Sequence, residues 1–398
     1  MTEERIFNRS SATLFFSIFM VGIGFSIIMP ILPYYAESMG ASAFQLGLLM
    51  TVYALCQFIF APFWGSYSDR VGRKPVLLVG MFGFTLTFYI FALANSLWVL
   101  FVARIAGGAL SCATVPTAMA VMGDTSSPEK RGASMGMVGA SMGMGMIFGP
   151  AIGSGLAHIS LAAPFVVAGS LSLLICFCIL FLVKESLPME DRVSEAQKID
   201  RAPLLKGLKS PLAFLFTAMF LASMAEATNM GTFALFAEGK LGFGPTSMGL
   251  IFSCAGLASV LVQGFVVGRS INKWGEEKTS GAGIILMALS FALFLQAKSL
   301  LELIIYMGIF SAGTGLIRPS ISAATSKRTT GSQGTAMGVL QGYDSLGRVI
   351  GPSLGGYLLD MNLSYAYISA IFFSGLAFLT LLFNRSRGKT KERENLLI

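Results

Sequence analysis

The chain has 398 residues, of which 54% are hydrophobic and 12% are charged, and its mean hydropathy is +0.73. Ordinary soluble domains carry about a quarter charged residues, so this composition excludes a soluble globular protein. The formal net charge of +8 would suit a nucleic-acid-binding protein, but the positions of the basic residues, described below, exclude that interpretation.

Long apolar segments recur along the whole chain, each near the roughly 20 residues that a helix needs to cross a bilayer. We predict twelve membrane-spanning helices, centred on residues 12–36, 45–67, 76–94, 97–121, 133–157, 162–183, 210–236, 246–268, 278–296, 300–322, 334–359 and 364–384. The first segment is too long for a signal peptide, and no small-residue cleavage site follows it. The sequence therefore predicts an all-α, multi-pass membrane protein.

The basic residues give an orientation to these spans. If both termini are cytoplasmic, the inner segments hold 23 of the 28 Lys and Arg residues, whereas the outer loops hold only Lys240 and Lys298. This distribution follows the positive-inside rule. The positive charge thus reflects membrane topology in the cytoplasmic membrane, and no nucleic-acid partner is expected.

The longest polar segment, residues 184–209, is charged, contains proline and lacks apolar periodicity. We interpret it as a cytoplasmic linker between an N-terminal six-helix bundle, residues 1–183, and a C-terminal six-helix bundle with a cytoplasmic tail, residues 210–398. Two halves of equal orientation match the parallel-repeat arrangement of many secondary transporters.

A repeated glycine pattern supports this duplication. One set of residues recurs 202 positions later: Gly136, Gly145, Gly149, Pro150 and Gly153 correspond to Gly338, Gly347, Gly351, Pro352 and Gly355. Within each set the last three glycines are four residues apart and form one stripe on a helix. Small residues let helices approach closely in lipid, and proline favours a bend. Gly136, half a turn out of phase, is expected to serve the opposite face; ordinary helix packing is the alternative for any single glycine.

The segment GSYSDRVGRKPVL, from Gly65 to Leu77, places basic residues and one carboxylate at the inner ends of two adjacent spans. We expect its two glycines to permit a tight turn. The carboxylate of Asp69 is expected to pair with Arg70 or Arg73, or to face the positive end of a helix. Contacts that form in one conformation and break in another would make a latch, and this candidate gating loop comprises Gly65, Asp69, Arg70, Gly72 and Arg73. Simple positive-inside topology is the alternative for its basic residues.

Charged side chains inside spans are costly in hydrocarbon and are therefore candidates for function. We find five: Arg104, Glu226, Arg318, Asp344 and Arg348. Asp344 and Arg348 are one helical turn apart and are expected to pair, which could be purely structural. Glu226 has no basic neighbour at helical spacing, so burial is expected to favour its neutral form and allow proton exchange; a buried structural pair is the alternative. Arg318, near an inner end, is expected to extend to the interface.

Adaptable side chains that can repack around dissimilar ligands are candidates for a substrate cavity. The set comprises Tyr34, Tyr53, Gln57, Met146, Asn229, Phe233, Gln341 and Tyr343. Most of the 22 Met and 33 Phe residues must face lipid or the protein core, which is the alternative for each member.

These motifs resemble those of the twelve-span drug:proton antiporters of the major facilitator superfamily, including Gram-positive multidrug exporters and tetracycline exporters. The pattern from Gly136 to Gly153 is similar to their antiporter motif, although Ser154 stands where a further glycine is common. The loop from Gly65 is similar to the superfamily signature, and its degenerate copy, GRSINKWGEEK, begins at Gly268. Two further segments, GIGFSIIMPILP from Gly22 and LFVARIAGG around Arg104, are similar to motifs of spans one and four.

The resemblance implies two pseudo-symmetric six-helix bundles and proton-coupled efflux of hydrophobic, cationic or zwitterionic small molecules by alternating access. It implies that Arg104 takes part in proton coupling, in addition to the candidates Glu226 and Asp344. It also implies that the gating loop stabilises the outward-facing state. Related multidrug exporters often carry an acid three residues before the arginine of span ten, where this chain has Gly315. The alternative is a narrow-spectrum exporter, of tetracycline type or for an endogenous metabolite or sugar.

Other classes of function are disfavoured. The chain has no Gly-Lys-Ser/Thr phosphate-binding loop for an ATP-driven pump, and one histidine with five span-located cysteines offers no metal site, disulfide framework or catalytic cluster. We therefore expect no enzyme activity, no cofactor and no metal. A channel or a receptor is the weaker alternative. The expected partners are a small-molecule substrate, protons and the lipid bilayer, and the expected state is a monomer.

Overall fold

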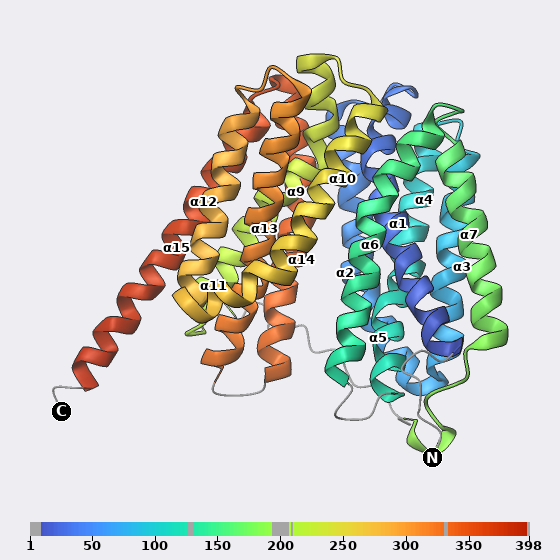
Figure 1. Ribbon diagram of the computed structural model, residues 1–398, viewed down its shortest axis with the longest axis horizontal. Helices are drawn as coiled ribbons and strands as arrows, with labels where there is room; N and C mark the ends of the chain where they lie inside the picture. Colours follow the sequence, from blue (N-terminus) through green and yellow to red (C-terminus); the bar gives the residue numbers. More distant parts are fainter. Residues whose placement is uncertain (1–8, 126–130, 193–206, 208–209, 330–332, 396–398) are drawn as a thin grey trace. The chain divides into compact units, whose positions relative to one another are not determined.

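A computed structural model describes residues 9–125, 131–192, 207, 210–329 and 333–395, and all of its regular secondary structure in these residues is helical. Most of the predicted linker, residues 193–206 and 208–209, lies outside the described residues. The helices are labelled in Figure 1. A short 3-10 turn, Met189–Asp191, lies between the helices of the first half of the chain and those of the second half.

The first half contains α1 (Arg9–Glu37), α2 (Ala43–Val71), α3 (Arg73–Ala92), α4 (Leu97–Leu110), α5 (Thr114–Asp124), α6 (Arg131–Ala157) and α7 (Ala163–Leu182). The second half contains α9 (Ala213–Leu241), α10 (Pro245–Leu261), α11 (Val267–Trp274), α12 (Glu276–Phe294), α13 (Leu300–Arg328), α14 (Gln333–Met361) and α15 (Tyr365–Asn395).

Each of the twelve predicted spans coincides with a helical segment. Two spans contain a local irregularity: a 3-10 turn, Ser111–Ala113, joins α4 to α5, and a π turn, Val262–Val266, joins α10 to α11. Among the described residues, ten segments are long and apolar enough to cross a membrane. The two others, α9 and α14, are as long as their neighbours but carry the ionisable residues Glu226, Asp344 and Arg348.

The described chain forms two compact units. Unit 1 is drawn from Met1–Ala41, Val52–Ile199 and Gly244–Ser253, and unit 2 from Ser42–Thr51, Asp200–Phe243 and Cys254–Ile398. Helices α2 and α10 are therefore each divided, because their first residues pack with one unit and the remainder with the other.

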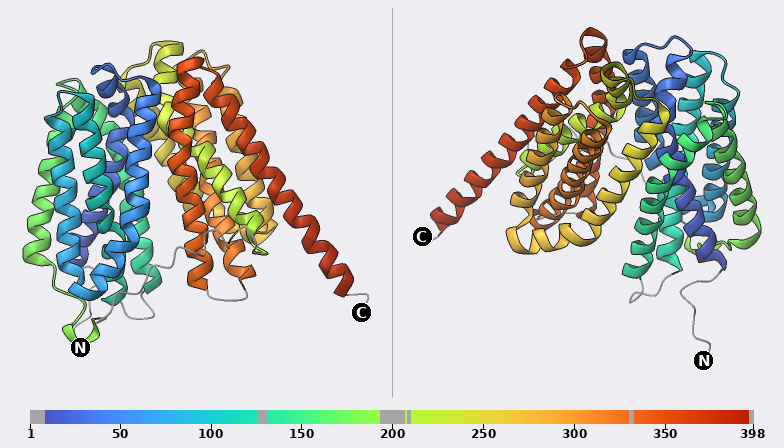
Figure 2. Two further views of the ribbon diagram at one scale, coloured as in Figure 1. Left: turned by 180° about the vertical axis from the view of Figure 1, so that it is seen from behind. Right: turned by 45° about the horizontal axis from the view of Figure 1, so that its top comes forward.

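In unit 1, α6 packs along α1 and α7 packs along α3 (Figure 1). Aromatic rings fill the core between α3 and α7: the ring of Phe165 stacks on Phe91 at 5.1 Å and on Phe88 at 6.5 Å between centroids. In unit 2, α9 contacts both α14 and α15, and α12 contacts α13. Figure 2 shows the C-terminal part of α15 extending away from its neighbours in this unit.

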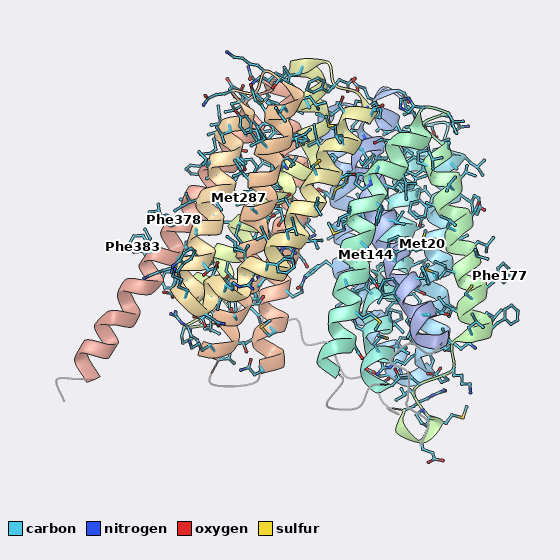
Figure 3. The ribbon with its side chains drawn as sticks, viewed as in Figure 1. Met20, Met144, Phe177, Met287, Phe378 and Phe383 are labelled. Atoms are coloured by element: carbon cyan, nitrogen blue, oxygen red, sulfur yellow. The ribbon has the colours of Figure 1, made fainter. Side chains whose placement is uncertain are left out.

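The side chains are distributed as in a membrane protein, with apolar residues both in the core and on the surface that faces lipid. Met287 is fully buried, whereas Phe177 is 51% exposed and Phe383 is 63% exposed and both point outward in Figure 3. The exposed apolar residues of these helices are consistent with a hydrocarbon environment.

Candidate functional site

The glycine stripe of unit 1 lets α6 lie directly against α1. A Cβ atom on Gly145 would lie 2.5 Å from the carbonyl oxygen of Phe19, and one on Gly149 would lie 2.0 Å from Ser26 Oγ. The Ser26 hydroxyl uses this closeness to donate a hydrogen bond to the Gly145 carbonyl at 3.0 Å. The contact predicted from the spacing of these glycines is thus a backbone-to-backbone approach of two helices.

Unit 2 repeats this contact between α14 and α9. A Cβ on Gly347 would lie 2.5 Å from the Phe220 carbonyl oxygen, and one on Gly351 would lie 2.4 Å from that of Met224. Thr228 donates to the Gly351 carbonyl at 3.1 Å, as Ser26 does to Gly145 in unit 1. The sequence duplication is therefore a duplication of one helix-pairing geometry.

With the residues that the structure describes, Gly136 does not form the packing contact that was expected of it. A Cβ on Gly136 or on Gly338 would meet no described atom within 4 Å, so the expected second packing face is not formed there by the described residues. Ser154, where the resemblance led us to expect glycine, instead approaches Gly249 of α10 in the same unit, where an added Cβ would lie 2.0 Å from Ser154 Oγ. At this contact the glycine is therefore on α10, and the larger residue, Ser154, is on α6.

Four of the five charged residues found inside the predicted spans meet in unit 2. Arg318 Nη2 on α13 lies 3.1 Å from Glu226 Oε2 on α9 and 2.8 Å from Asp344 Oδ1 on α14. Arg348 Nε lies 3.4 Å from the second oxygen of Asp344, which confirms the pair expected one turn apart. We call Glu226, Arg318, Asp344 and Arg348 the charge cluster.

The two carboxylates of the charge cluster differ in burial and in number of partners. The Asp344 side chain is 2% exposed and also accepts hydrogen bonds from Ser223 and Gln341, whereas the Glu226 side chain is 21% exposed and has Arg318 as its ion-pair partner. The expectation that Arg318 extends away to the interface is wrong: its guanidinium joins three helices. The premise that Glu226 lacks a basic neighbour holds only along its own helix, because Arg318 reaches it from α13.

The gating loop of unit 1 is a compact ionic network. Asp69 pairs with Arg73, one of its two expected partners, at 2.5 Å, and Arg73 also contacts Asp124 at the end of α5 at 3.2 Å. Gly72 has φ +109 and makes the turn between α2 and α3. Gly65 was expected to help form this turn, but it lies inside α2, and none of the described atoms would come within 4 Å of an added Cβ.

Glu185 completes this network, although it is not among the site residues predicted from the sequence. Its carboxylate accepts hydrogen bonds from the backbone N–H groups of Arg73 at 2.8 Å and Lys74 at 3.2 Å, the first residues of α3. It also accepts from the N–H groups of Ser186 at 3.0 Å and Leu187 at 3.1 Å. The start of the linker is thereby attached to the gating loop. The signal for this contact was an acid three residues after the end of a long apolar helix, together with a helix start, that of α3, without a side-chain cap.

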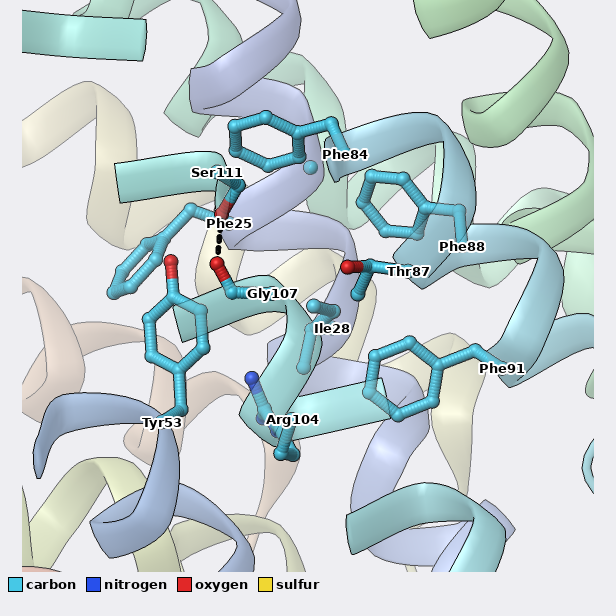
Figure 4. A pocket seen from close by; sticks show the side chains of 11 residues that line it. Phe25, Ile28, Tyr53, Phe84, Thr87, Phe88, Phe91, Arg104, Gly107 and Ser111 are labelled. Atoms are coloured by element: carbon cyan, nitrogen blue, oxygen red, sulfur yellow. Dashed lines mark hydrogen bonds between the residues drawn. The ribbon is translucent and has the colours of Figure 1, made fainter. Parts of the chain in front are cut away.

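Arg104 lies apart from the charge cluster, in unit 1. It is 4% exposed, and its guanidinium carbon lies 5.2 Å from the centre of the Tyr53 ring and 5.7 Å from that of Phe91. Figure 4 shows these side chains around a small pocket whose wall also includes Phe25 and Thr87. A cation enclosed by aromatic faces is stabilised by their quadrupoles, which accounts for how an arginine is accommodated inside a span.

The candidate cavity residues have varied surroundings. Phe233 is fully buried and packs on Phe294 with ring centres 5.1 Å apart, so it belongs to the core of unit 2 and not to a cavity wall. Tyr34 is also buried. Tyr343 stacks on Phe216, and the amide of Asn229 points to the sulfur of Met307. More accessible are the remaining candidates, Tyr53, Gln57, Met146 and Gln341.

The sequence profile of the Major Facilitator Superfamily matches residues 14–225 and, a second time, residues 215–396. Multidrug resistance protein 2 of Bacillus subtilis is 30% identical over 361 residues, which cover 89% of this chain and 90% of that protein. The class B tetracycline resistance protein of Escherichia coli is 32% identical over 366 residues, with the same coverage. The quinolone resistance protein NorA of Staphylococcus aureus is 25% identical and covers 97% of this chain and 99% of that protein.

Solved transporter structures share this fold. The human organic anion transporter MFSD10 matches with a TM-score of 0.67 at 22% identity, covering 94% of this chain and 99% of that one. The nucleoside transporter NupG matches with a TM-score of 0.78 at 15% identity, covering 96% of this chain and 99% of that one. At these identities the likeness concerns the arrangement of helices.

Proposed function

Since the chain belongs to the Major Facilitator Superfamily, we propose that it exports hydrophobic small molecules, cationic or zwitterionic, across the cytoplasmic membrane in exchange for protons. Both termini then lie in the cytoplasm, and the protein works as a monomer by alternating access. Similarity to three proteins named for resistance to drugs, tetracycline and quinolones supports export.

The observation that carries proton coupling is that one guanidinium nitrogen, Arg318 Nη2, serves two carboxylates on different helices. Proton binding to Glu226 neutralises one of these acceptors, and Arg318 then remains with Asp344. The contact between α9 and α13 thus changes with protonation, while the Asp344 contacts between α9 and α14 persist. Glu226 is also the more exposed carboxylate of the two, which suits exchange with water. We assign the exchanged proton to Glu226 and an ordering role to Asp344.

The remaining candidate site residues have supporting roles in this proposal. The network of Asp69 and Arg73 acts as a latch on the cytoplasmic side, and Arg104 supports coupling in the N-terminal bundle. The glycine stripes provide the close helix pairs that move as rigid units during the transport cycle.

The test is uphill efflux in inside-out membrane vesicles with an imposed pH gradient, using tetracycline, a quinolone and ethidium as separate probes. We expect Glu226→Gln to lose uphill transport of every probe that the wild type moves, while it keeps substrate counterflow, which needs no net proton movement. Glu37→Gln, which changes an exposed acid at the end of α1, is the control and should transport normally.

Two results would contradict the proposal at different levels. Accumulation by Glu226→Gln at the wild-type rate would refute the assignment of the proton to that residue. Wild-type accumulation that persists after nigericin collapses the pH gradient would refute proton coupling itself.

The second candidate is a narrow-spectrum exporter of the tetracycline type, which the 32% identity to the class B tetracycline resistance protein favours. Growth inhibition across chemically distinct toxic compounds, in cells without other exporters, separates the two. Protection against tetracyclines alone supports the narrow spectrum, and protection against unrelated hydrophobic cations supports the broad one.

A further inference from the structure

The first turn of α2 is held by a carboxylate that is distant in sequence. Asp360, near the end of α14, accepts hydrogen bonds from the backbone N–H groups of Ala43 and Phe44, both at 2.9 Å, one to each of its oxygens. All three residues belong to unit 2, whereas α2 from Val52 onward belongs to unit 1. The cap therefore acts on a helix that both units share.

The helix does not need this carboxylate in order to begin. Ser42 Oγ accepts from the N–H of Gln45 at 3.2 Å, and Gln45 Oε1 accepts from the N–H of Ser42 at 2.9 Å. This reciprocal pair is a complete capping box. Asp360, which lies on α14, accepts from the two N–H groups that the capping box leaves without a partner. Its contribution is therefore to the position of α2 against α14.

The backbones of the two helices meet closely beside this cap. A Cβ on Gly356 would lie 2.2 Å from the Ala43 carbonyl oxygen, and one on Gly47 would lie 2.2 Å from that of Pro352. One further turn along α2, Thr51 donates to the Val349 carbonyl at 2.6 Å. Asp360 thus closes one end of a continuous contact that runs over two turns.

The duplicated half provides a natural comparison. The residue 202 positions before Asp360 is His158, and it lies beside the start of α10, where its Nε2 is 3.1 Å from Thr246 Oγ1. There Ser154 donates to the Pro245 carbonyl at 2.8 Å. The pairing of α6 with α10 thus resembles that of α14 with α2, but the two differ at the helix start. At α10 His158 makes one exposed contact with a side chain, whereas at α2 the Asp360 carboxylate accepts from two backbone N–H groups. A carboxylate is also favoured at a helix N-terminus by the helix dipole.

We propose that Asp360 is a positioning residue of the transport cycle, which clasps the outer start of α2 to α14 and must release it when the transporter opens to the outside. Opening requires residues 42–51 to leave unit 2, and Asp360 stabilises the state in which they remain there. The proposal rests on alternating access and not on the substrate or the proton.

The test is hydrogen–deuterium exchange of the purified full-length protein in detergent, without substrate and at one pH. In Asp360→Ala we expect the amides of residues 43–50 to exchange about fivefold faster, the ratio that corresponds to a typical cap loss of ~1 kcal/mol. Asp360→Asn, which keeps one acceptor, should give a smaller increase. Glu37→Gln is the matched control and should change nothing.

A second segment distinguishes a clasp from a local cap. If release at the outer end favours the outward-open state, the gating loop around Gly72 should exchange more slowly in Asp360→Ala than in the wild type, because its latch is then closed more of the time. Faster exchange at residues 43–50 with no change at the loop would overturn the proposal, and so would a rise in exchange throughout the protein. Neither readout involves transport, so failure here is distinct from failure of proton coupling.

Discussion

Removing the carboxylate of Asp344 should destabilise the protein more than removing that of Glu226. The charge cluster holds two acids and two bases, and Asp344 contacts both arginines. Asp344→Asn leaves Arg318 and Arg348 with one carboxylate between them. Glu226→Gln also leaves one acid, but that acid is Asp344, which already contacts both guanidinium groups.

The magnitude follows from burial. Breaking a buried ion pair by removing one partner costs about 3–5 kcal/mol. The two arginine side chains are 31% and 30% exposed, which lets water reduce the cost, so we expect about 3 kcal/mol for Asp344→Asn. Within the described part of the chain Glu226 has one ion-pair contact, at 3.1 Å, and it is 21% exposed, so about 1 kcal/mol is expected for Glu226→Gln. The difference of ~2 kcal/mol is roughly a thirtyfold ratio of unfolding constants.

The assay is denaturation of purified variants in mixed detergent micelles, followed by tryptophan fluorescence, with the midpoint converted to a free energy of unfolding. The double variant Asp344→Asn/Arg348→Gln restores one acid to one base and should recover about half of the loss. Equal destabilisation by Glu226→Gln and Asp344→Asn would refute the reasoning, as would a double variant less stable than Asp344→Asn alone.

The sequence was sufficient to predict the features that depend on local patterns. The apolar segments located helices at all twelve predicted positions, ten of them apolar enough to cross a membrane, and the 202-residue offset identified the helices whose glycines form close contacts. The pair of Asp344 and Arg348 was predictable because a spacing of four residues places two side chains on one face of a helix. Each of these inferences uses only the geometry of a single helix or a comparison of the chain with itself.

Contacts between helices distant in sequence were not predictable in this way. Arg318 reaches Glu226 from 92 residues away, and Glu185 reaches Arg73 from 112 residues away. Nothing in the local sequence of Asp360 or Glu185 shows which backbone N–H groups face these two carboxylates. These pairings depend on which helices are neighbours and on the direction in which each helix runs. A residue pattern within one helix shows neither.

Two further predictions concern the helix contacts and the linker. Gly149→Leu should reduce folded protein severely while Gly136→Leu is tolerated, because an added Cβ meets Ser26 in the first case and no described atom within 4 Å in the second; equal yields by fluorescence-detected size exclusion would contradict this. The last prediction is that Glu185→Ala exposes the linker. Four backbone N–H groups donate to this carboxylate, two from α3 and two from the linker itself, so its loss frees both segments at once. Losing the cap of α3 should cost ~1 kcal/mol, and trypsin should therefore cleave after Lys184 and Arg192 about fivefold faster in inside-out vesicles. Glu190→Ala, at an exposed acid in the same segment, is the control. If both variants are cleaved at the wild-type rate, Glu185 does not hold the linker to the gating loop.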